Sequence, residues 1–185
     1  MKLQDKVALV TGAAGGIGLA IARRFVDEGA YVLLADRKEA ELTAAARALG
    51  ERAAAFVADV TDPAAAKALA DDCLARWGGL DICVCNAGVI RAADFLDLTL
   101  ADLDAVMNVN VRGTFLVAQA AARAMVAGGR RNGAIVTLSS MTAELAMPDQ
   151  LAYGASKGAV RQMTKSMALS LACLLYTSDA ADEGL

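Results

Sequence analysis

The sequence contains no histidine, and it has only two prolines and 4% aromatic residues. The absence of histidine removes the usual general base of enzymes and excludes every Ser-His and Cys-His nucleophile system. It also removes the commonest metal ligand, and we expect no metal site. Any acid–base chemistry must therefore use other side chains.

Long apolar runs are also missing. Although 57% of the 185 residues are apolar, no run approaches the ~20 residues that a membrane helix needs. Lys2 and Lys6 precede the stretch VALVTGAAGGIGLAIA, but four glycines and a threonine interrupt it, so we expect no signal peptide. The sequence predicts a soluble protein with one buried core and no membrane partner.

The chain has no excess of positive charge. Its net charge is −3, and three acidic residues lie in a C-terminal segment without Lys or Arg: Asp179, Asp182 and Glu183. Without them the charges balance. A nucleic-acid partner normally requires a basic patch, so we expect none.

Two of the four cysteines, Cys83 and Cys85, lie on the same face of one short apolar segment. Neighbours at i and i+2 of a strand do not suit a disulfide. We therefore expect buried, reduced thiols and a cytoplasmic protein.

Short β-rich runs alternate with longer helical stretches. The runs are KVALVTG, AYVLLAD, AAAFVADV, LDICVCNAG and GAIVTLSS, and the helical stretches after them span 16–29, 38–49, 63–77, 100–127 and 151–172. Strands that are apolar throughout indicate a parallel sheet covered by helices on both faces. The sequence predicts an α/β fold with a doubly wound, Rossmann-like sheet in three layers.

A glycine-rich segment follows the first strand. Gly12, Gly16 and Gly18 come directly after Thr11, so backbone N–H groups and a helix N-terminus are open to a phosphate. A side chain there keeps a pyrophosphate away from the backbone. The spacing alone fits a tight turn equally well.

Asp36 ends the second strand about 20 residues beyond the glycines, where a carboxylate accepts hydrogen bonds from an adenosine ribose. It repels a 2′-phosphate, and Ala14 in the loop offers no charge to attract one. NAD is therefore favoured over NADP. Arg37 keeps the choice open, since its guanidinium can compensate Asp36; a solvated strand end is the alternative for both residues.

These residues resemble the short-chain dehydrogenase/reductase family, in the single-domain branch with the T-G-x-x-x-G-x-G loop. The likeness runs from about Lys6 to Ala172 and carries further motifs: Asp59-Val60, NAG at 86–88, NVRG at 110–113, and Ser140 thirteen residues before YGASK. It implies an NAD(P)-binding domain over 1–172 that lacks the last strands of the family fold. Cys85 and Ala143 depart from residues common in the family.

The resemblance implies the following cofactor-binding residues: Gly12, Gly16, Ile17, Gly18, Asp36, Arg37, Asp59, Val60, Asn86, Ala87, Gly88, Tyr153 and Lys157.

Hydride transfer at a carbinol carbon needs a partner for the hydroxyl proton, and Tyr153 is a candidate. Lys157, at i+4 on the same helical face, favours the tyrosinate by its charge. The resemblance adds a bond from Lys157 to the nicotinamide ribose, a substrate-holding role for Ser140 and a water-anchoring role for Asn110. Taken singly, each of the four residues also fits a structural role. Tyr153 fits an interface aromatic and Lys157 a solvated charge. Ser140 fits a strand-end cap, and Asn110 fits a polar residue inside a helix.

The segment MTAELAMPDQLA between Ser140 and Tyr153 should border the substrate, where Glu144 and Gln150 either bond a polyhydroxylated ligand or face solvent. We expect an oxidoreductase that interconverts a secondary alcohol and a ketone, such as a sugar or polyol. A 3-oxoacyl thioester reductase is the nearest enzymatic alternative. A non-catalytic dinucleotide-binding fragment is the alternative from another class.

Two expectations concern assembly and the C-terminus. Relatives are commonly homotetramers or homodimers through the two long helices, 100–127 and 151–172. Residues 173–185 do not continue the helical spacing of apolar residues found in 151–172. The stretch CLLYTSDAADE resembles the in-frame translation of a sequencing-library adapter. We expect 173–185 to be a non-native tail, the fifth strand to be an edge and this chain to be a poor enzyme. A long read of the source DNA across the codon for Ala172 tests this expectation.

Overall fold

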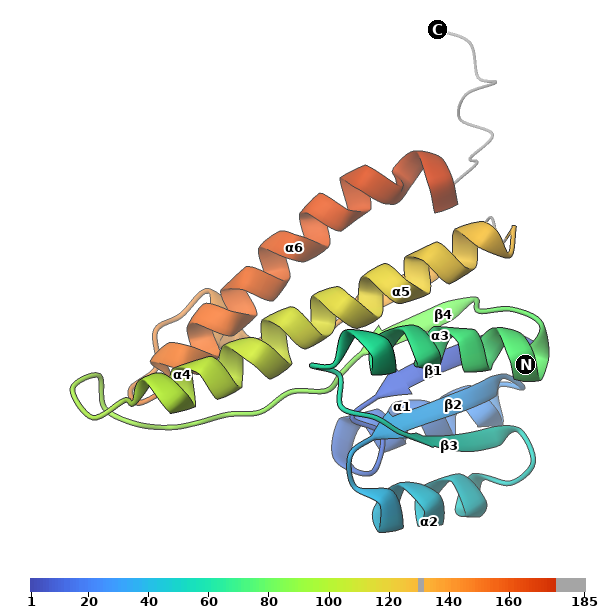
Figure 1. Ribbon diagram of the computed structural model, residues 1–185, viewed down its shortest axis with the longest axis horizontal. Coiled ribbons are helices and arrows are strands. Elements are labelled where there is room, and N and C mark those ends of the chain that lie inside the picture. The colour runs from blue at the N-terminus through green and yellow to red at the C-terminus, as the bar shows by residue number, and fades with distance from the viewer. Residues whose placement is uncertain (130–131, 176–185) are drawn as a thin grey trace, which may run out of the picture.

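The computed structural model describes residues 1–129 and 132–175 (Figure 1). Five strands form one sheet in the order β3-β2-β1-β4-β5, and all four pairings are parallel. The strands are β1 Val7–Thr11, β2 Tyr31–Asp36, β3 Ala53–Val57, β4 Ile82–Cys85 and β5 Ala134–Thr137. The predicted parallel α/β sheet is confirmed.

Helices follow each strand as predicted. The helices are α1 Gly16–Asp27, α2 Glu39–Leu49, α3 Pro63–Trp77, α4 Leu100–Met107, α5 Thr114–Ala127 and α6 Leu151–Leu175, with a 3-10 turn η2 at Met141–Ala143. The ends of α1 and α2 lie within two residues of the predicted ones. The predicted helix 100–127 is interrupted by a π-helical segment, η1, at Asn108–Gly113. The last helix continues three residues past the predicted end at 172.

The core lies in two layers, one on each face of the sheet. Alternate strand residues point to opposite faces, because the side-chain period of a strand is two. Ala8 and Val10 of β1 pack with α1 and α2, whereas Leu9 packs with α3 and α5 on the other face. The doubly wound, three-layer arrangement is therefore confirmed.

The helix starts show how local sequence places these elements. Asp62 caps α3 by accepting a 2.9 Å hydrogen bond from the Ala64 N–H, and Pro63 occupies the first helical position. Thr99 caps α4 through the N–H of Asp102 at 3.1 Å. No side chain caps α1, which begins after Gly15.

Three cysteines are free and buried in the core: Cys73, Cys83 and Cys85. The Sγ atoms of Cys83 and Cys85 lie 3.8 Å apart on one face of β4, as the period of a strand requires. Burial raises the pKa of the Cys73 thiol to about 12. A thiol with so high a pKa stays protonated and is a poor nucleophile at neutral pH.

The strand order reverses between β1 and β4, and this reversal positions the site. Chain connections leave the carboxyl ends of these two strands toward opposite faces, which opens a crevice there in folds of this kind. At the other side of β4, β5 pairs with no second strand within the described residues, and Val136 is 46% exposed.

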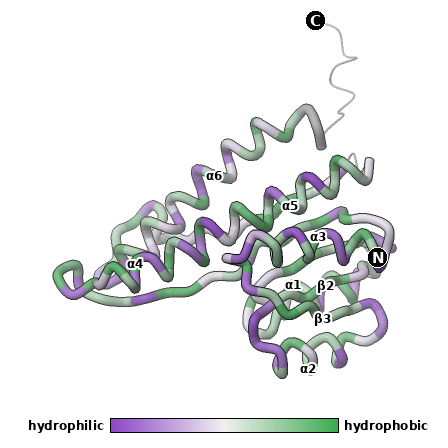
Figure 2. Tube along the Cα trace, in the orientation of Figure 1, coloured by the Kyte–Doolittle hydropathy of each residue, from purple (hydrophilic) through white to green (hydrophobic). Residues whose placement is uncertain are grey.

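The long helices α5 and α6 run beside each other, and α5 also packs on α3 and on one face of the sheet (Figure 1). Figure 2 shows hydrophilic and hydrophobic residues interspersed along both helices. In the described part of the chain, no helix is both long enough and apolar enough to cross a membrane.

The division into 1–172 and 173–185 stays a prediction. Residues 176–185, which make up most of the predicted tail, lie outside the described residues.

Candidate active site

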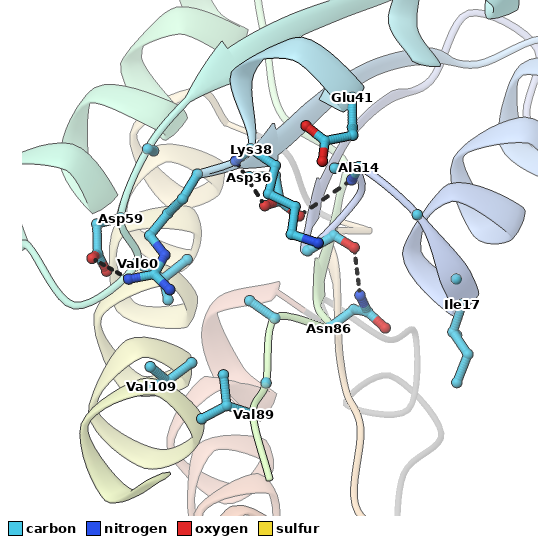
Figure 3. A pocket seen from close by; sticks show the side chains of 17 residues that line it. Ala14, Ile17, Asp36, Lys38, Glu41, Asp59, Val60, Asn86, Val89 and Val109 are labelled. Carbon is cyan, nitrogen blue, oxygen red and sulfur yellow. Dashed lines mark hydrogen bonds and ion pairs between the residues drawn. The ribbon is translucent and has the colours of Figure 1, made fainter. Parts of the chain in front are cut away.

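A pocket of about 800 Å³ opens at the carboxyl ends of β1, β2, β3 and β4 (Figure 3). This volume lies in the range of pockets that hold small ligands and cofactors. Ten of the predicted cofactor-binding residues line it: Gly12, Gly16, Ile17, Asp36, Arg37, Asp59, Val60, Asn86, Ala87 and Gly88. Residues of four segments, far apart in sequence, thus meet in one place.

The base of the pocket depends on close backbone packing. A Cβ at Gly18 would lie 2.3 Å from the Gly12 carbonyl oxygen and 2.6 Å from Asn86 Nδ2. The Asn86 amide occupies that space, donating hydrogen bonds to the carbonyls of Thr11 at 2.9 Å and Gly12 at 3.1 Å. Gly18 is buried behind the pocket and does not line it, so its role is to let the turn and β4 approach each other.

The other side of the same turn is open. A Cβ at Gly15 or Gly16 would meet no atom within 4 Å, and Gly16 has φ +54°, a conformation that favours glycine. These glycines precede the first turn of α1, which no side chain caps. Exposed N–H groups at a helix N-terminus suit a phosphate. The cradle therefore fits the pyrophosphate of a dinucleotide.

Asp36 lines the pocket beside the glycine-rich turn and is fixed by two backbone groups. Its Oδ2 accepts from the Ala14 N–H at 3.2 Å, and its Oδ1 accepts from the Lys38 N–H at 3.1 Å (Figure 3). These bonds tie the glycine-rich turn to the end of β2. The carboxylate is thereby held at the pocket wall, where it can also accept bonds from a ligand hydroxyl.

Asp59 follows β3, the strand that pairs with β2, and lines the pocket together with Asp36. Its Oδ1 accepts from the N–H of Thr61 at 2.9 Å and from the Thr61 hydroxyl at 2.8 Å, and its Oδ2 pairs with Arg37 Nη1 at 3.3 Å. The Thr61 N–H bond holds the pKa of the Asp59 carboxyl below its ordinary value of 3.8, with the Thr61 hydroxyl and Arg37 acting in the same direction. Asp59 is therefore ionised at neutral pH.

A second group of polar side chains surrounds Asn110, which is buried in the π-helical segment η1. Its Oδ1 accepts from the Val89 N–H at 2.8 Å, and its Nδ2 donates to the Val89 carbonyl at 2.9 Å and to Ser156 Oγ at 3.0 Å. The Ser156 hydroxyl donates in turn to the Tyr153 carbonyl at 2.7 Å. Asn110 thus links the loop after β4 to α6.

Tyr153 and Lys157 lie one turn apart on α6. Lys157 Nζ is 5.5 Å from the centre of the Tyr153 ring and donates to the Leu138 carbonyl at 2.6 Å. Lys157 is only 7% exposed, and burial lowers the pKa of its ammonium group. The alternative interpretation of Lys157 as a solvated charge is therefore wrong.

Ser140 lies just after β5 and caps η2. Its Oγ accepts from the Thr142 N–H at 3.2 Å and from the Thr142 hydroxyl at 2.9 Å. A Cβ at Gly154 would lie 3.0 Å from the Thr142 carbonyl oxygen, so η2 packs closely on the first turn of α6. The four predicted catalytic residues lie outside the lining of the 800 Å³ pocket, and Val89 connects the two groups.

The two residues predicted near the substrate differ in their surroundings. Glu144 is exposed and forms an ion pair with Arg161 of α6 at 2.5 Å. Gln150 is partly buried just before α6. Glu144 must therefore leave Arg161, or share it, in order to bond a ligand.

Sequence reasoning missed two residues of the site. Thr11 Oγ1 accepts from the N–H groups of Asn86 and Ala87, both at 3.1 Å, and so joins β1 to the NAG loop. Ser156 connects Asn110 to α6. The signal for both was a polar side chain in an otherwise apolar setting, Thr11 at the end of an apolar strand and Ser156 between Tyr153 and Lys157.

Comparison with known proteins gives consistent matches. The model of the family described as short chain dehydrogenase matches residues 6–173. Sorbitol dehydrogenase of Cereibacter sphaeroides is 40% identical over 171 residues, which are 92% of this chain and 66% of that protein. D-threitol dehydrogenase of Mycolicibacterium smegmatis is 42% identical over 170 residues, 90% of this chain and 65% of that protein. The chain spans about two thirds of the length of these curated relatives.

Two further matches cover a similar part of the chain. A 3-oxoacyl-(acyl-carrier-protein) reductase FabG of Thermotoga maritima is 38% identical over 93% of this chain and 70% of that protein. A crystal structure of a short-chain type dehydrogenase/reductase from Mycobacterium marinum superimposes with a TM-score of 0.89 at 39% identity, over 94% of this chain and 72% of that chain.

Proposed function

Because the chain belongs to the short-chain dehydrogenase/reductase family, we propose that the protein is an oxidoreductase acting on a secondary alcohol of a polyol or sugar. Two of its relatives carry the names of polyol dehydrogenases, for sorbitol and D-threitol. The observation that carries the proposal is the Tyr153–Lys157 pair on α6, linked by Asn110 to the loop that lines the pocket. Family membership implies a nicotinamide dinucleotide as cofactor.

We propose that this cofactor is NAD. The open glycine cradle at Gly15 and Gly16 suits the pyrophosphate, and Asp36 is held where it can accept from the adenosine ribose. A carboxylate at that point repels a 2′-phosphate, which favours NAD over NADP. The other cofactor-binding residues proposed from the sequence are those that line the pocket, with Gly18 behind it and with Tyr153 and Lys157 at the nicotinamide end.

The roles of the catalytic residues follow from their chemistry. When bound, a nicotinamide would supply the acceptor for the hydride of the carbinol carbon, and the hydroxyl proton would be left for the protein to remove. Tyr153 takes that proton as a phenolate, and the ammonium of Lys157 stabilises the phenolate by its charge. We propose that Ser140 orients the substrate oxygen by donating its O–H, because both contacts with Thr142 use the lone pairs of its Oγ.

In this proposal, Asn110 takes part through its position, because its amide connects Val89 with Ser156. The resemblance also assigns Asn110 the anchoring of a water that leads to Lys157. The buried amine of Lys157 bonds the Leu138 carbonyl and is thereby fixed in place for either task.

A 3-oxoacyl thioester reductase is a second candidate, supported by the 38% identity to such an enzyme of Thermotoga maritima. A non-catalytic dinucleotide-binding protein needs Gly12, Gly18 and Asp36 but has no use for Tyr153 and Lys157. A cytoplasmic location and a homodimer or homotetramer through α5 and α6 are also proposals; reduced buried cysteines support the first, and the exposed Phe115 and Leu169 support the second.

The test is a substrate panel assayed at high protein concentration. Sorbitol, D-threitol and galactitol with NAD⁺ are compared with a 3-oxoacyl thioester and NADPH. Tyr153→Phe should lower turnover at least ~100-fold, because it removes the proton acceptor. Binding of NADH, measured by fluorescence, should stay within about twofold, because the ten proposed cofactor-binding residues that line the pocket are unchanged in this variant.

The outcomes separate the candidates. Preference for the thioester with NADPH contradicts the polyol proposal and supports the second candidate. Binding of NADH without turnover of any substrate supports the non-catalytic protein. Unchanged turnover in Tyr153→Phe contradicts the proposed proton transfer.

A further inference from the structure

The adenosine end of the pocket carries more charge than the choice of NAD requires. Besides Asp36, two cations follow at once in the sequence, Arg37 and Lys38, and both line the pocket together with Glu41 and Asp59 (Figure 3). A guanidinium is well suited to a phosphate, because its N–H groups form bidentate hydrogen bonds. Arg37 is thus a group that could favour a 2′-phosphate and work against Asp36.

In this structure Arg37 is already bonded. Its Nη1 lies 3.3 Å from Oδ2 of Asp59, which belongs to the loop after β3. Most exposed ion pairs are weak, because both side chains lose freedom when they meet. The Asp59 carboxylate has lost that freedom already, since two bonds from Thr61 hold its Oδ1 and leave its Oδ2 to face Arg37.

We propose that Asp59 is a second determinant of cofactor choice, because it keeps the Arg37 guanidinium as its own ion-pair partner and so withholds it from a 2′-phosphate. This inference rests on the proposed nucleotide site. Asp36 acts on a 2′-phosphate directly by repulsion, whereas Asp59 acts through Arg37. A phosphate carries a charge of about −1.5 to −2 at neutral pH, so it competes well for a guanidinium that is released.

The test uses ligands that occupy the adenosine end alone and needs no catalytic turnover. Adenosine 5′-monophosphate and adenosine 2′,5′-bisphosphate are titrated calorimetrically into the chain. Asp59→Asn is the decisive variant, because the amide oxygen still accepts from Thr61 while the charge that holds Arg37 is gone. The bisphosphate should gain roughly tenfold in affinity relative to the monophosphate, the scale expected for one added guanidinium–phosphate contact.

A double-mutant cycle separates this mechanism from simple removal of a negative charge. In the Arg37→Gln background, Asp59→Asn should change the affinity ratio by less than about twofold, because no guanidinium is released. In the Lys38→Gln background, which removes the neighbouring cation instead, the roughly tenfold gain should persist. Arg37→Gln alone should leave the ratio within about twofold, since Asp59 already occupies the guanidinium.

Each outcome of these titrations either supports or overturns the inference about Asp59. A gain of the same size with and without Arg37 overturns the inference and leaves a general charge effect. No gain in Asp59→Asn, with a melting curve that shows a folded protein, also overturns it. If Asp59→Asn does not fold, a large loss of bisphosphate affinity in Arg37→Gln alone contradicts the inference, and an unchanged ratio supports it. Failure of the unmodified chain to bind either nucleotide overturns the proposed site itself.

Discussion

The nucleotide pocket and the polar group around Asn110 are built in different ways. The pocket depends on close backbone packing. This packing requires residues without a Cβ atom, as at Gly12 and Gly18. The group around Asn110 depends on side chains that are present and bonded, with Ser156 as the link to α6. Val89 belongs to both, because it lines the pocket and bonds Asn110.

The two constructions should fail in opposite ways. A site made by close backbone approach is damaged by an added atom, whereas a bonded group of buried polar side chains is damaged when one partner is removed. The comparison is therefore tested directly by substitutions that add one carbon to the nucleotide pocket or remove one oxygen from the polar group around Asn110.

The largest effect is expected from Gly18→Ala. The added Cβ would lie 2.3 Å from the Gly12 carbonyl oxygen, so the turn and β4 must separate. Overpacking by backbone contacts costs about 3 kcal/mol, which corresponds to a fall of roughly 10 °C in the melting temperature of a chain of this size. Thermal unfolding followed by circular dichroism measures it, and binding of adenosine 5′-monophosphate should fall as well.

Gly15→Ala is the matched control for stability. It adds the same methyl group three residues earlier, where a Cβ meets no atom within 4 Å and φ is −171°. Its melting temperature should stay within about 2 °C of the unmodified protein, since Ala tolerates an extended backbone. Equal destabilisation by the two variants would mean that close packing at Gly18 does not hold the turn.

The difference between the two regions also explains which parts of the fold and of the site could be predicted from the sequence. The strands, the order of the glycines and Asp36 were predictable, because apolar runs and turn residues report local structure directly. The pocket lined by ten predicted residues follows from that local pattern once the sheet is parallel.

The bonded group was harder to predict. No periodicity indicates that the helix at 100–127 becomes π-helical at Asn108–Gly113, which aims Asn110 at Val89 and Ser156. The pairing of Glu144 with Arg161 likewise depends on how η2 packs on α6. Contacts between residues distant in sequence depend on tertiary structure. The sequence suggested Asn110 and Ser140 only through a family resemblance, whereas Tyr153 and Lys157 followed also from the chemistry of proton transfer and their i+4 spacing.

An intermediate effect is expected from Ser156→Ala. It leaves Asn110 Nδ2 without its partner in α6, in a place where no exposed surface supplies a replacement. A buried donor that loses its partner costs about 1 to 3 kcal/mol, or roughly 3 to 10 °C in the melting temperature of a chain of this size. If the link also positions Tyr153, then kcat should fall more than KM rises.

Ser170→Ala is the control for this prediction. Ser170 on the same helix donates to the Ser166 carbonyl at 3.0 Å, as Ser156 does to Tyr153, but it is exposed. Its loss should change stability by less than about 0.5 kcal/mol, the usual range for surface positions. Equal effects at positions 156 and 170 would show that the bond to Asn110 contributes nothing.

The smallest effect concerns the pH dependence of stability caused by Lys157. Burial lowers the pKa of its ammonium below the ordinary value of 10.5, so the folded protein releases this proton before the unfolded chain does. Stability must then rise with pH between the folded pKa and 10.5, because the unfolded state binds more protons there. Lys157→Met, which keeps much of the apolar stem, lacks this contribution.

We therefore expect the unmodified protein to gain stability relative to Lys157→Met as the pH rises from 7 toward 10.5, measured by denaturant unfolding at several pH values. Lys165→Met removes an exposed lysine of the same helix, and subtracting its pH dependence isolates the effect of burial. A relative loss of stability over this range would mean that the protein environment favours the charged amine. Burial would then not disfavour the charged form of Lys157, and the hydrogen bond to the Leu138 carbonyl would be enough to explain the position of Lys157 near Tyr153.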